Sequence, residues 1–326
     1  MKKNFMLVVV ASFMLASCSK EDVNPTPSTG KTELGISAVI AGAVVNRGLT
    51  DNFATDSVID VFIENEKTGE TDYTPKIADF IDNAATWETP DSTKIYLTNE
   101  EADVYAFYPK GAVGDVDFGA KTLKVNVDSV QNFDATSQKD YMYGTAREGS
   151  DGSYTYPLAT ASNAIGSSNV DLFFHHVLSE LSFIVNRGAS YTGAGVLTSV
   201  KLTKSDGFLA GTNVGTVSLS DGAISGLNVA TNIVFTGSTT INAAAGTTAL
   251  VKGLVAPITA TTGITLTLTI DGKDMVITLP STNPANAWAQ GKNYTYTINV
   301  QGTELSVVTV AITAWENVTG GTVVAS

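Results

Sequence analysis

The chain has 326 residues, of which 43% are hydrophobic and 16% are charged, so it can bury real cores and is not disordered throughout. Acidic residues outnumber basic ones by 32 to 19, and a net charge of −13 repels phosphate backbones, which argues against nucleic acid as a partner. A single cysteine excludes an intramolecular disulfide framework and any multi-thiolate metal site.

Residues 1–17 are predicted to be a signal peptide. Lys2 and Lys3 precede an apolar run, Phe5 to Leu15, that is too short to span a bilayer. Small residues then lead to the lone cysteine, and Leu15-Ala16-Ser17-Cys18 resembles a bacterial lipobox. We therefore expect lipidation of Cys18 and anchoring in the outer membrane. The alternative is an ordinary signal peptide with an incidental cysteine.

Residues 18–32 are predicted to form the lipidated tether. The segment Ser19 to Asp22 is similar to the acidic signal that directs lipoproteins to the cell surface in Bacteroidetes-type bacteria. It would equally suit a solvated tether. Asn24 to Lys31 is rich in Pro, Ser, Thr and Gly, a composition typical of a flexible linker.

From Glu33 onward the pattern is typical of β-structure. Gly263 to Ile270 alternates apolar residues with Thr, Asp271 to Asp274 supplies a turn, and Met275 to Leu279 returns, which predicts a hairpin. Other runs with the same period or with hairpin signals are Lys121 to Asp128, Thr216 to Leu219, Tyr294 to Val300 and Val308 to Thr313. One apolar face and one Thr-rich face favour antiparallel sheets that pack face to face as β-sandwiches.

A change of composition predicts two domains. Residues 50–145 carry many acids and aromatics, whereas residues 189–290 are rich in Gly, Ala and Thr. We therefore expect an N-terminal β-sandwich over residues 33–170 and a C-terminal β-sandwich over residues 171–326.

The residue types that usually carry out catalysis are not arranged in a sequence pattern typical of a catalytic or metal site. His175 and His176 are adjacent, so in a regular strand they point to opposite faces and cannot chelate one ion; we expect one to be buried and the other to lie on the surface. Most acids lie in turns, and the three tryptophans are far apart in sequence and are expected in cores. We predict no catalytic residue, no metal and no cofactor.

Several segments together resemble the fimbrillin family, the lipoprotein precursors of Bacteroidales type V pili. They are the Trp87 to Lys110 region with Val104-Tyr-Ala-Phe-Tyr-Pro109, Asp140-Tyr-Met-Tyr-Gly144, Phe174 to Phe183, Gly291 to Tyr296 and Ile312 to Trp315. The resemblance implies an all-β chain with two transthyretin-like antiparallel β-sandwich domains in tandem. It also implies a structural subunit, stalk or tip, of a cell-surface fimbria that supports adhesion. The implied partners are other fimbrial subunits and a host or bacterial surface ligand.

In the family, polymerisation follows removal of the first strand, and this logic can be applied here. Leu34 to Val45 is expected to be that strand, and Arg47-Gly48 follows it as a site for a trypsin-like protease. The groove left behind would be filled by a neighbour's C-terminal strand. The donor-strand candidates are Val308, Val310, Ile312 and Ala314.

Alternatives remain open for both the cut and the function. Arg47 is equally well explained as a turn residue after an edge strand, because Val185 to Gly188 repeats the tetrad Val-Asn-Arg-Gly of Val45 to Gly48 with no reason to be cut. The alternative function is a monomeric surface lipoprotein that binds glycans through loop aromatics. A third and weaker hypothesis is a hydrolase that uses a pair of carboxylates, because the spacing of Asp and Glu residues in the sequence singles out no such pair.

Overall fold

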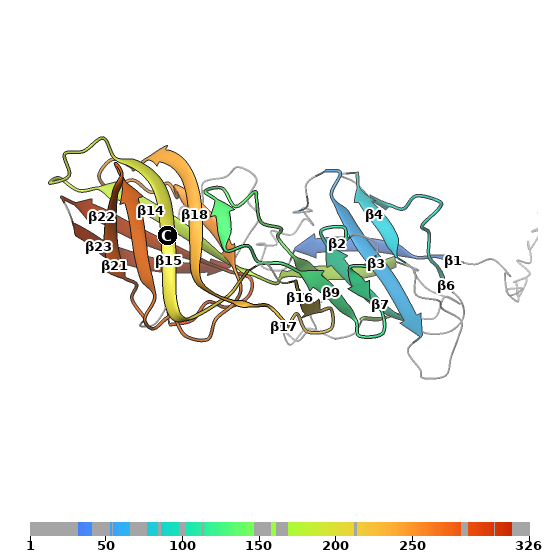
Figure 1. Cartoon of the computed structure of the whole chain (residues 1–326). Helices are drawn as coiled ribbons and strands as arrows, with labels where there is room; N and C mark the ends of the chain where they lie inside the picture. The colour runs from blue at the N-terminus through green and yellow to red at the C-terminus, as the bar shows by residue number, and fades with distance from the viewer. Residues whose placement is uncertain are drawn as a thin grey trace, which may run out of the picture. The chain divides into compact units, whose positions relative to one another are not determined.

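The computed structural model describes the chain from Thr32 to Ala314 with gaps. The described residues are 32–40, 53, 55–65, 77–83, 86–97, 102–111, 114–146, 158–160, 169–211, 214–281, 286–302 and 304–314. Every regular element in these ranges is a β-strand, and the predicted all-β fold class is confirmed (Figure 1).

One sheet buries one of its faces in a core of its own. Its strand order is β2-β13-β11-β7-β3-β4-β5, and β12 also pairs with β7. The bounds are β2 (Gly35–Ile40), β3 (Val58–Asn65), β4 (Ala78–Asp82), β5 (Trp87–Glu88), β7 (Ala102–Tyr108), β11 (Met142–Ala146), β12 (Leu158–Thr160) and β13 (Asn169–His176). Its buried side chains, including Ile59, Phe80, Val104 and Phe174, form one continuous cluster. We call this sheet the N-sheet.

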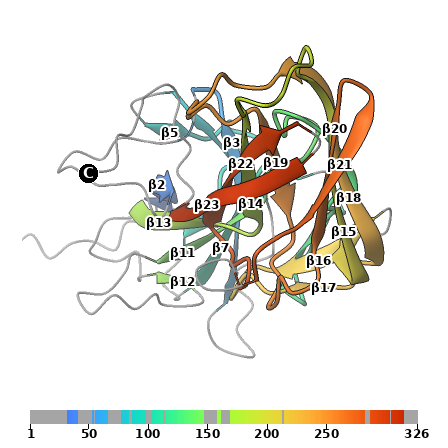
Figure 2. The same cartoon turned by 90° about the vertical axis from the view of Figure 1, so that its left-hand side faces the viewer.

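Two further sheets supply the inward faces of a larger core. One has the order β10-β18-β15-β20-β21, with bounds β10 (Val130–Asn132), β15 (Val196–Leu209), β18 (Val229–Thr240), β20 (Thr265–Ile270) and β21 (Lys273–Thr278). The other has the order β19-β14-β22-β23, with bounds β14 (Ser179–Arg187), β19 (Val251–Val255), β22 (Lys292–Gln301) and β23 (Glu304–Ala314), and Figure 2 shows β14, β22 and β23 side by side. We call this second one the C-sheet.

Two small sheets complete the described strands. One contains β17 (Ile224–Ser225), β16 (Gly215–Ser218), β9 (Thr122–Val125) and β8 (Val116–Asp117), and the other pairs β1 (Thr32–Glu33) with β6 (Tyr96–Leu97). Strands from the two halves of the sequence pair with each other, because β9 pairs with β16 in the first of these small sheets and β10 pairs with β18 in the five-stranded sheet. In addition, β13 runs across positions 170 and 171. The domain boundaries stay a prediction.

The period-2 pattern anticipated individual strands well. The predicted hairpin is β20–β21: Leu266, Leu268 and Ile270 are fully buried, and Asp271 (φ 51°) and Gly272 (φ 73°) both take the positive φ that a tight two-residue turn requires. The runs near residues 122, 216, 294 and 308 are β9, β16, β22 and β23. Pairing is mostly antiparallel, as expected, but β2–β13, β14–β22 and β10–β18 are parallel, which residue alternation alone does not reveal.

Candidate functional site

The predicted site residues divide into two groups. Cys18, Arg47 and Gly48 lie outside the described residues, so lipidation and cleavage stay predictions. The donor-strand candidates Val308 to Ala314 belong to β23. The strand that the cut would release is represented by β1 and β2.

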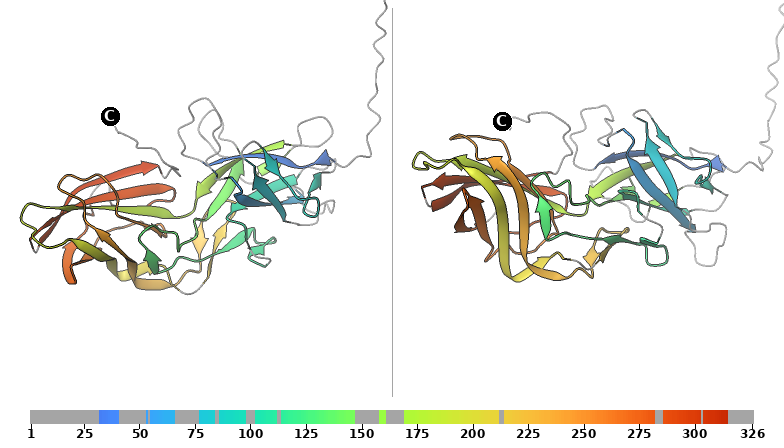
Figure 3. Two further views of the ribbon diagram at one scale, coloured as in Figure 1. Left: turned by 90° about the horizontal axis from the view of Figure 1, so that it is seen from above. Right: turned by 45° about the horizontal axis from the view of Figure 1, so that its top comes forward.

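Strand β2 is an edge strand that is deeply inserted into the N-sheet core. Leu34, just before it, and Ile36, Ala38 and Ile40 within it are 1%, 6%, 1% and 3% exposed. It pairs in parallel with β13, from Gly35 opposite Asn169 to Ile40 opposite Phe174. In Figure 3 it is the dark blue strand. An edge strand with such buried side chains leaves an apolar groove when it is removed.

Polar contacts fix the register of β2 on β13. The Ser37 hydroxyl donates to the Asp171 carboxylate at 2.5 Å. At Gly35 a Cβ would lie 2.6 Å from Asn169 Oδ1, so a side chain there would require the Asn169 side chain to move. A slip by one residue would lose the Ser37–Asp171 bond and turn the apolar side chains outward.

The inward side chains of strand β23 are less deeply buried than those of β2. Strand β23 is an edge strand of the C-sheet and pairs antiparallel with β22, with Ile312 opposite Tyr294 and Val310 opposite Tyr296. Val310 and Ile312 are half-buried against the core, and Val307 joins them. The ladder shifts register between Val307 and Thr309, which explains why Val307 packs against the core. Without the shift, strict alternation from Ile312 would predict Val308 on the core-facing side.

The second Val-Asn-Arg-Gly tetrad lies at the end of β14, whose last residue is Arg187, and the Gly188 N–H donates to the Val300 carbonyl at 2.8 Å. Arg187 pairs with Val300, and its backbone N–H donates to the Asn242 carbonyl at 2.8 Å. Its guanidinium donates to the Ala194 carbonyl at 2.5 Å and lies 5.9 Å from the centre of the Tyr191 ring. A protease needs extended, unpaired backbone, so this copy is protected by the fold.

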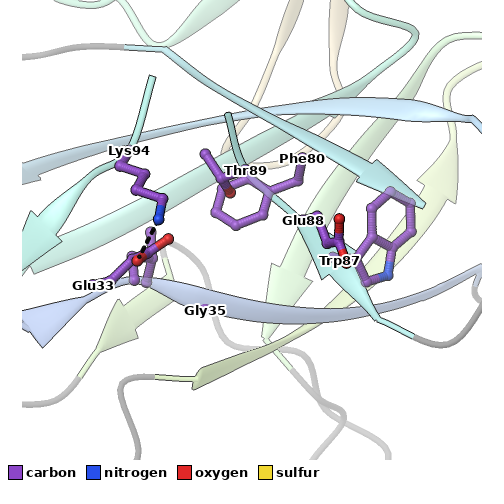
Figure 4. Close-up of a pocket in the computed structure, with 8 residues that line it drawn as sticks. Glu33, Gly35, Phe80, Trp87, Glu88, Thr89 and Lys94 are labelled. Carbon is purple, nitrogen blue, oxygen red and sulfur yellow. Dashed lines mark ion pairs between the residues drawn. The ribbon is translucent and has the colours of Figure 1, made fainter. Parts of the chain in front are cut away.

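A pocket of about 440 Å³ lies along the first strand. Glu33, Leu34 and Gly35 form one side, and the other lining residues are Phe80, Trp87, Glu88, Thr89 and Lys94. Figure 4 shows the Lys94–Glu33 ion pair at one end, Trp87 and Glu88 at the other, and Phe80 and Thr89 between them. The pocket is therefore built partly from the strand that is predicted to be removed.

The N-sheet contains a buried acid that the sequence analysis did not single out. Asp60 is 1% exposed and accepts a hydrogen bond from the Gly111 N–H at 2.9 Å. Burial, together with the charge of Asp79 opposite it, raises the pKa of Asp60 to about 7, while Lys110 forms an ion pair with Asp79. A lone acid within the apolar run Val58 to Ile63 was the available signal.

The two histidines face different partners, as their adjacency predicted. His176 is buried with Nδ1 3.0 Å from Asp140 Oδ1, and His175 is half-buried with Nε2 2.9 Å from the Thr145 hydroxyl. The expectation that one would lie on the surface was wrong, because Tyr143 packs beside His175. Burial and the neighbouring His176 lower the pKa of His175 to about 4.

Across the described ranges, no three His, Cys, Asp or Glu residues are grouped so that they could hold a metal ion. Nor do those ranges contain a helix with the length and apolarity to cross a membrane.

Trp288 is fully buried and its indole N–H donates to the Tyr296 hydroxyl at 2.9 Å, which confirms its expected core position.

Comparison with known proteins assigns this arrangement of strands to a family. The sequence matches the profile of the fimbrillin-like family over residues 45–315. The chain belongs to the fimbrillin-like family. No curated protein sequence gives a significant match.

Solved structures share this fimbrillin-like fold at low sequence identity. A candidate cell adhesion protein from Bacteroides uniformis is 18% identical with a TM-score of 0.60, covering 89% of this chain and 99% of that one. Another from Bacteroides ovatus is 13% identical with a TM-score of 0.63, covering 88% and 98%. A fimbrial protein from Bacteroides vulgatus is 13% identical with a TM-score of 0.57, covering 87% and 99%.

Proposed function

We propose that this chain is a structural subunit of a cell-surface fimbria, exported as a lipoprotein on Cys18 and polymerised by strand exchange. A cut between Arg47 and Gly48 would release the first strand, and a neighbour's C-terminal strand would replace it. Membership of the fimbrillin-like family supports a fimbrial role with other fimbrial subunits as partners. The observation that carries the proposal is the depth at which β2, an edge strand, is buried.

The energetics favour exchange once a competitor is present. Burying Leu34, Ile36 and Ile40 contributes on the order of 5–8 kcal/mol before ordering costs, so an empty groove is unstable in water. An incoming strand offers the same apolar side chains and backbone hydrogen bonds. Donation by Val308 to Ala314 requires β23 to leave β22, where Val310 and Ile312 are only half-buried. Full burial in a neighbour's groove would offset that loss.

The test is limited digestion of the purified chain with trypsin, followed by size-exclusion chromatography and SDS gels without heating. Wild type should lose residues before Gly48 and form SDS-resistant oligomers. Arg47→Ala should stay monomeric under the same digestion. A wild type that is cut at Arg47 and remains monomeric at all concentrations contradicts strand exchange.

Glycan binding by a monomeric lipoprotein is the second candidate. It is favoured by the half-buried Trp87 in the pocket, next to Glu88, Thr89 and Lys94, because an aromatic ring beside polar groups suits a sugar. Retention of uncut wild type on a polysaccharide column, lost in Trp87→Ala, would support this function. Equal elution of the two proteins would count against it.

A further inference from the structure

The first strand is held at a second place besides the N-sheet. Glu33 of β1 pairs with Tyr96 of β6, and the Leu34 N–H donates to the Ile95 carbonyl at 2.9 Å. The Glu33 carboxylate also lies 3.1 Å from Lys94 Nζ. All of these partners lie in residues 94–97, which we call the clasp.

We propose that the clasp retains the first strand after it has been cut, so that strand exchange must wait for the clasp to open. This inference rests on the proposed function, because it concerns the fate of the strand that the cut would release. Cleavage after Arg47 frees the end of the strand that follows Ile40. The opposite end stays tied to the clasp.

The geometry of the pocket makes this second attachment matter. Among the described strands, β2 has one hydrogen-bonded neighbour, β13. The pocket lies along the side of the first strand that faces Trp87 and Glu88 of β5. The pocket, of about 440 Å³, thus lies where another strand would otherwise pair with β2. Besides the apolar burial of its side chains, the β13 ladder and the clasp are therefore the two attachments among the described residues that oppose departure of the strand.

Lys94 links the clasp to the strand by charge. It lies 3.1 Å from Glu33 and 3.0 Å from Asp91, and its hydrogen bonds to these two acids raise its pKa, so it stays cationic at neutral pH. Asp91 precedes the clasp in the chain, and its side chain is exposed and forms an ion pair with Lys94. Of these two acids, Glu33 is the one that belongs to the first strand, which gives a matched pair of acids for an experiment.

Hydrogen–deuterium exchange on the purified, uncut full chain tests the clasp without any cleavage. Lys94→Glu should speed exchange of residues 32–40 about fivefold or more, because an ion pair is replaced by repulsion from Glu33. Asp91→Asn is the control and should change that rate less than twofold. The charge swap Glu33→Lys with Lys94→Glu should return exchange toward the wild-type rate, and residues 265–270 should be unchanged throughout. Wild-type exchange of residues 32–40 in Lys94→Glu, or equal acceleration in Asp91→Asn, would overturn the clasp.

A second measurement separates failure of the clasp from failure of the proposed function. After trypsin has cut at Arg47, native mass spectrometry follows loss of the cut peptide, which should be about fivefold faster in Lys94→Glu than in Asp91→Asn. Faster loss with no oligomers supports the clasp and contradicts strand exchange. Equal rates of loss in the two variants overturn the clasp, whether or not oligomers form.

Discussion

Strands β2 and β23, which lie near the two ends of the described chain, are both edge strands, yet they are buried to very different depths. The inward side chains of β2 are almost inaccessible to water, whereas Val310 and Ile312 of β23 are half-buried. The shallower strand has the longer ladder, from Lys292 opposite Ala314 to Gln301 opposite Glu304. Hence β2 is held mainly by apolar burial, and β23 mainly by backbone pairing.

This difference would give the proposed strand exchange a direction. A strand that is half-buried at home gains apolar burial by moving into the groove of a neighbour, whereas its backbone hydrogen bonds are exchanged for similar ones. A strand that is already fully buried gains nothing by leaving. The proposal therefore places removal at β2 and donation at β23.

The largest expected effect compares matched truncations in the two strands. Ile40→Ala should lower the free energy of unfolding by about 2–5 kcal/mol, because it leaves a cavity in the N-sheet core. Ile312→Ala should cost about 1 kcal/mol, since half-buried Ile312 already contacts water. Denaturant unfolding of both variants measures this. Equal losses would mean that the two strands are held alike.

The second prediction uses pH to act on the sheet that carries β2. The pKa of Asp60 is raised to about 7, so folding takes up a proton and stability falls as pH rises from about 4 to 7. Asp60→Asn keeps an acceptor for the Gly111 N–H but has no charge to desolvate, and should gain about 2–3 kcal/mol over wild type at pH 8. The gain should vanish near pH 4. Denaturant unfolding at both pH values checks this, and a gain that does not depend on pH would refute the assignment.

The third prediction concerns the same sheet, but here stability rises with pH instead of falling. The pKa of His175 is lowered to about 4, so its neutral form supports folding above pH 6.5, and that support is lost as pH falls toward 4. His175→Gln, which cannot be protonated, should recover about 1–2 kcal/mol relative to wild type at pH 5 compared with pH 8. Thermal unfolding across this range measures it. Identical pH profiles for the two proteins would exclude His175 as a cause of acid sensitivity.

The strands were predictable where burial alternates strictly along the chain, as in Thr265 to Ile270. The parallel pairing of β2 with β13 was not, because it joins segments more than a hundred residues apart and leaves no local pattern. The clasp could not be predicted for the same reason, because in the sequence Glu33 and Lys94 look like ordinary surface charges until the fold brings them together. At the bulge near Val308 the backbone shift overrides alternation, so the inward residue is Val307.

The smallest effect concerns the two Val-Asn-Arg-Gly tetrads, which have the same sequence but are expected to behave differently toward a protease. In the folded chain trypsin should leave Arg187 intact, because its backbone is paired with β22 and bonded to Asn242. Arg187→Ala should cost about 1 kcal/mol through loss of the contacts with Ala194 and Tyr191, without changing which fragments form. Arg47→Ala should leave stability unchanged and abolish the fragment that starts at Gly48. N-terminal sequencing of the digest identifies the cut. A fragment that starts at Gly188 under native conditions would show that the paired backbone of β14 does not protect it, and the distinction between the tetrads would be lost.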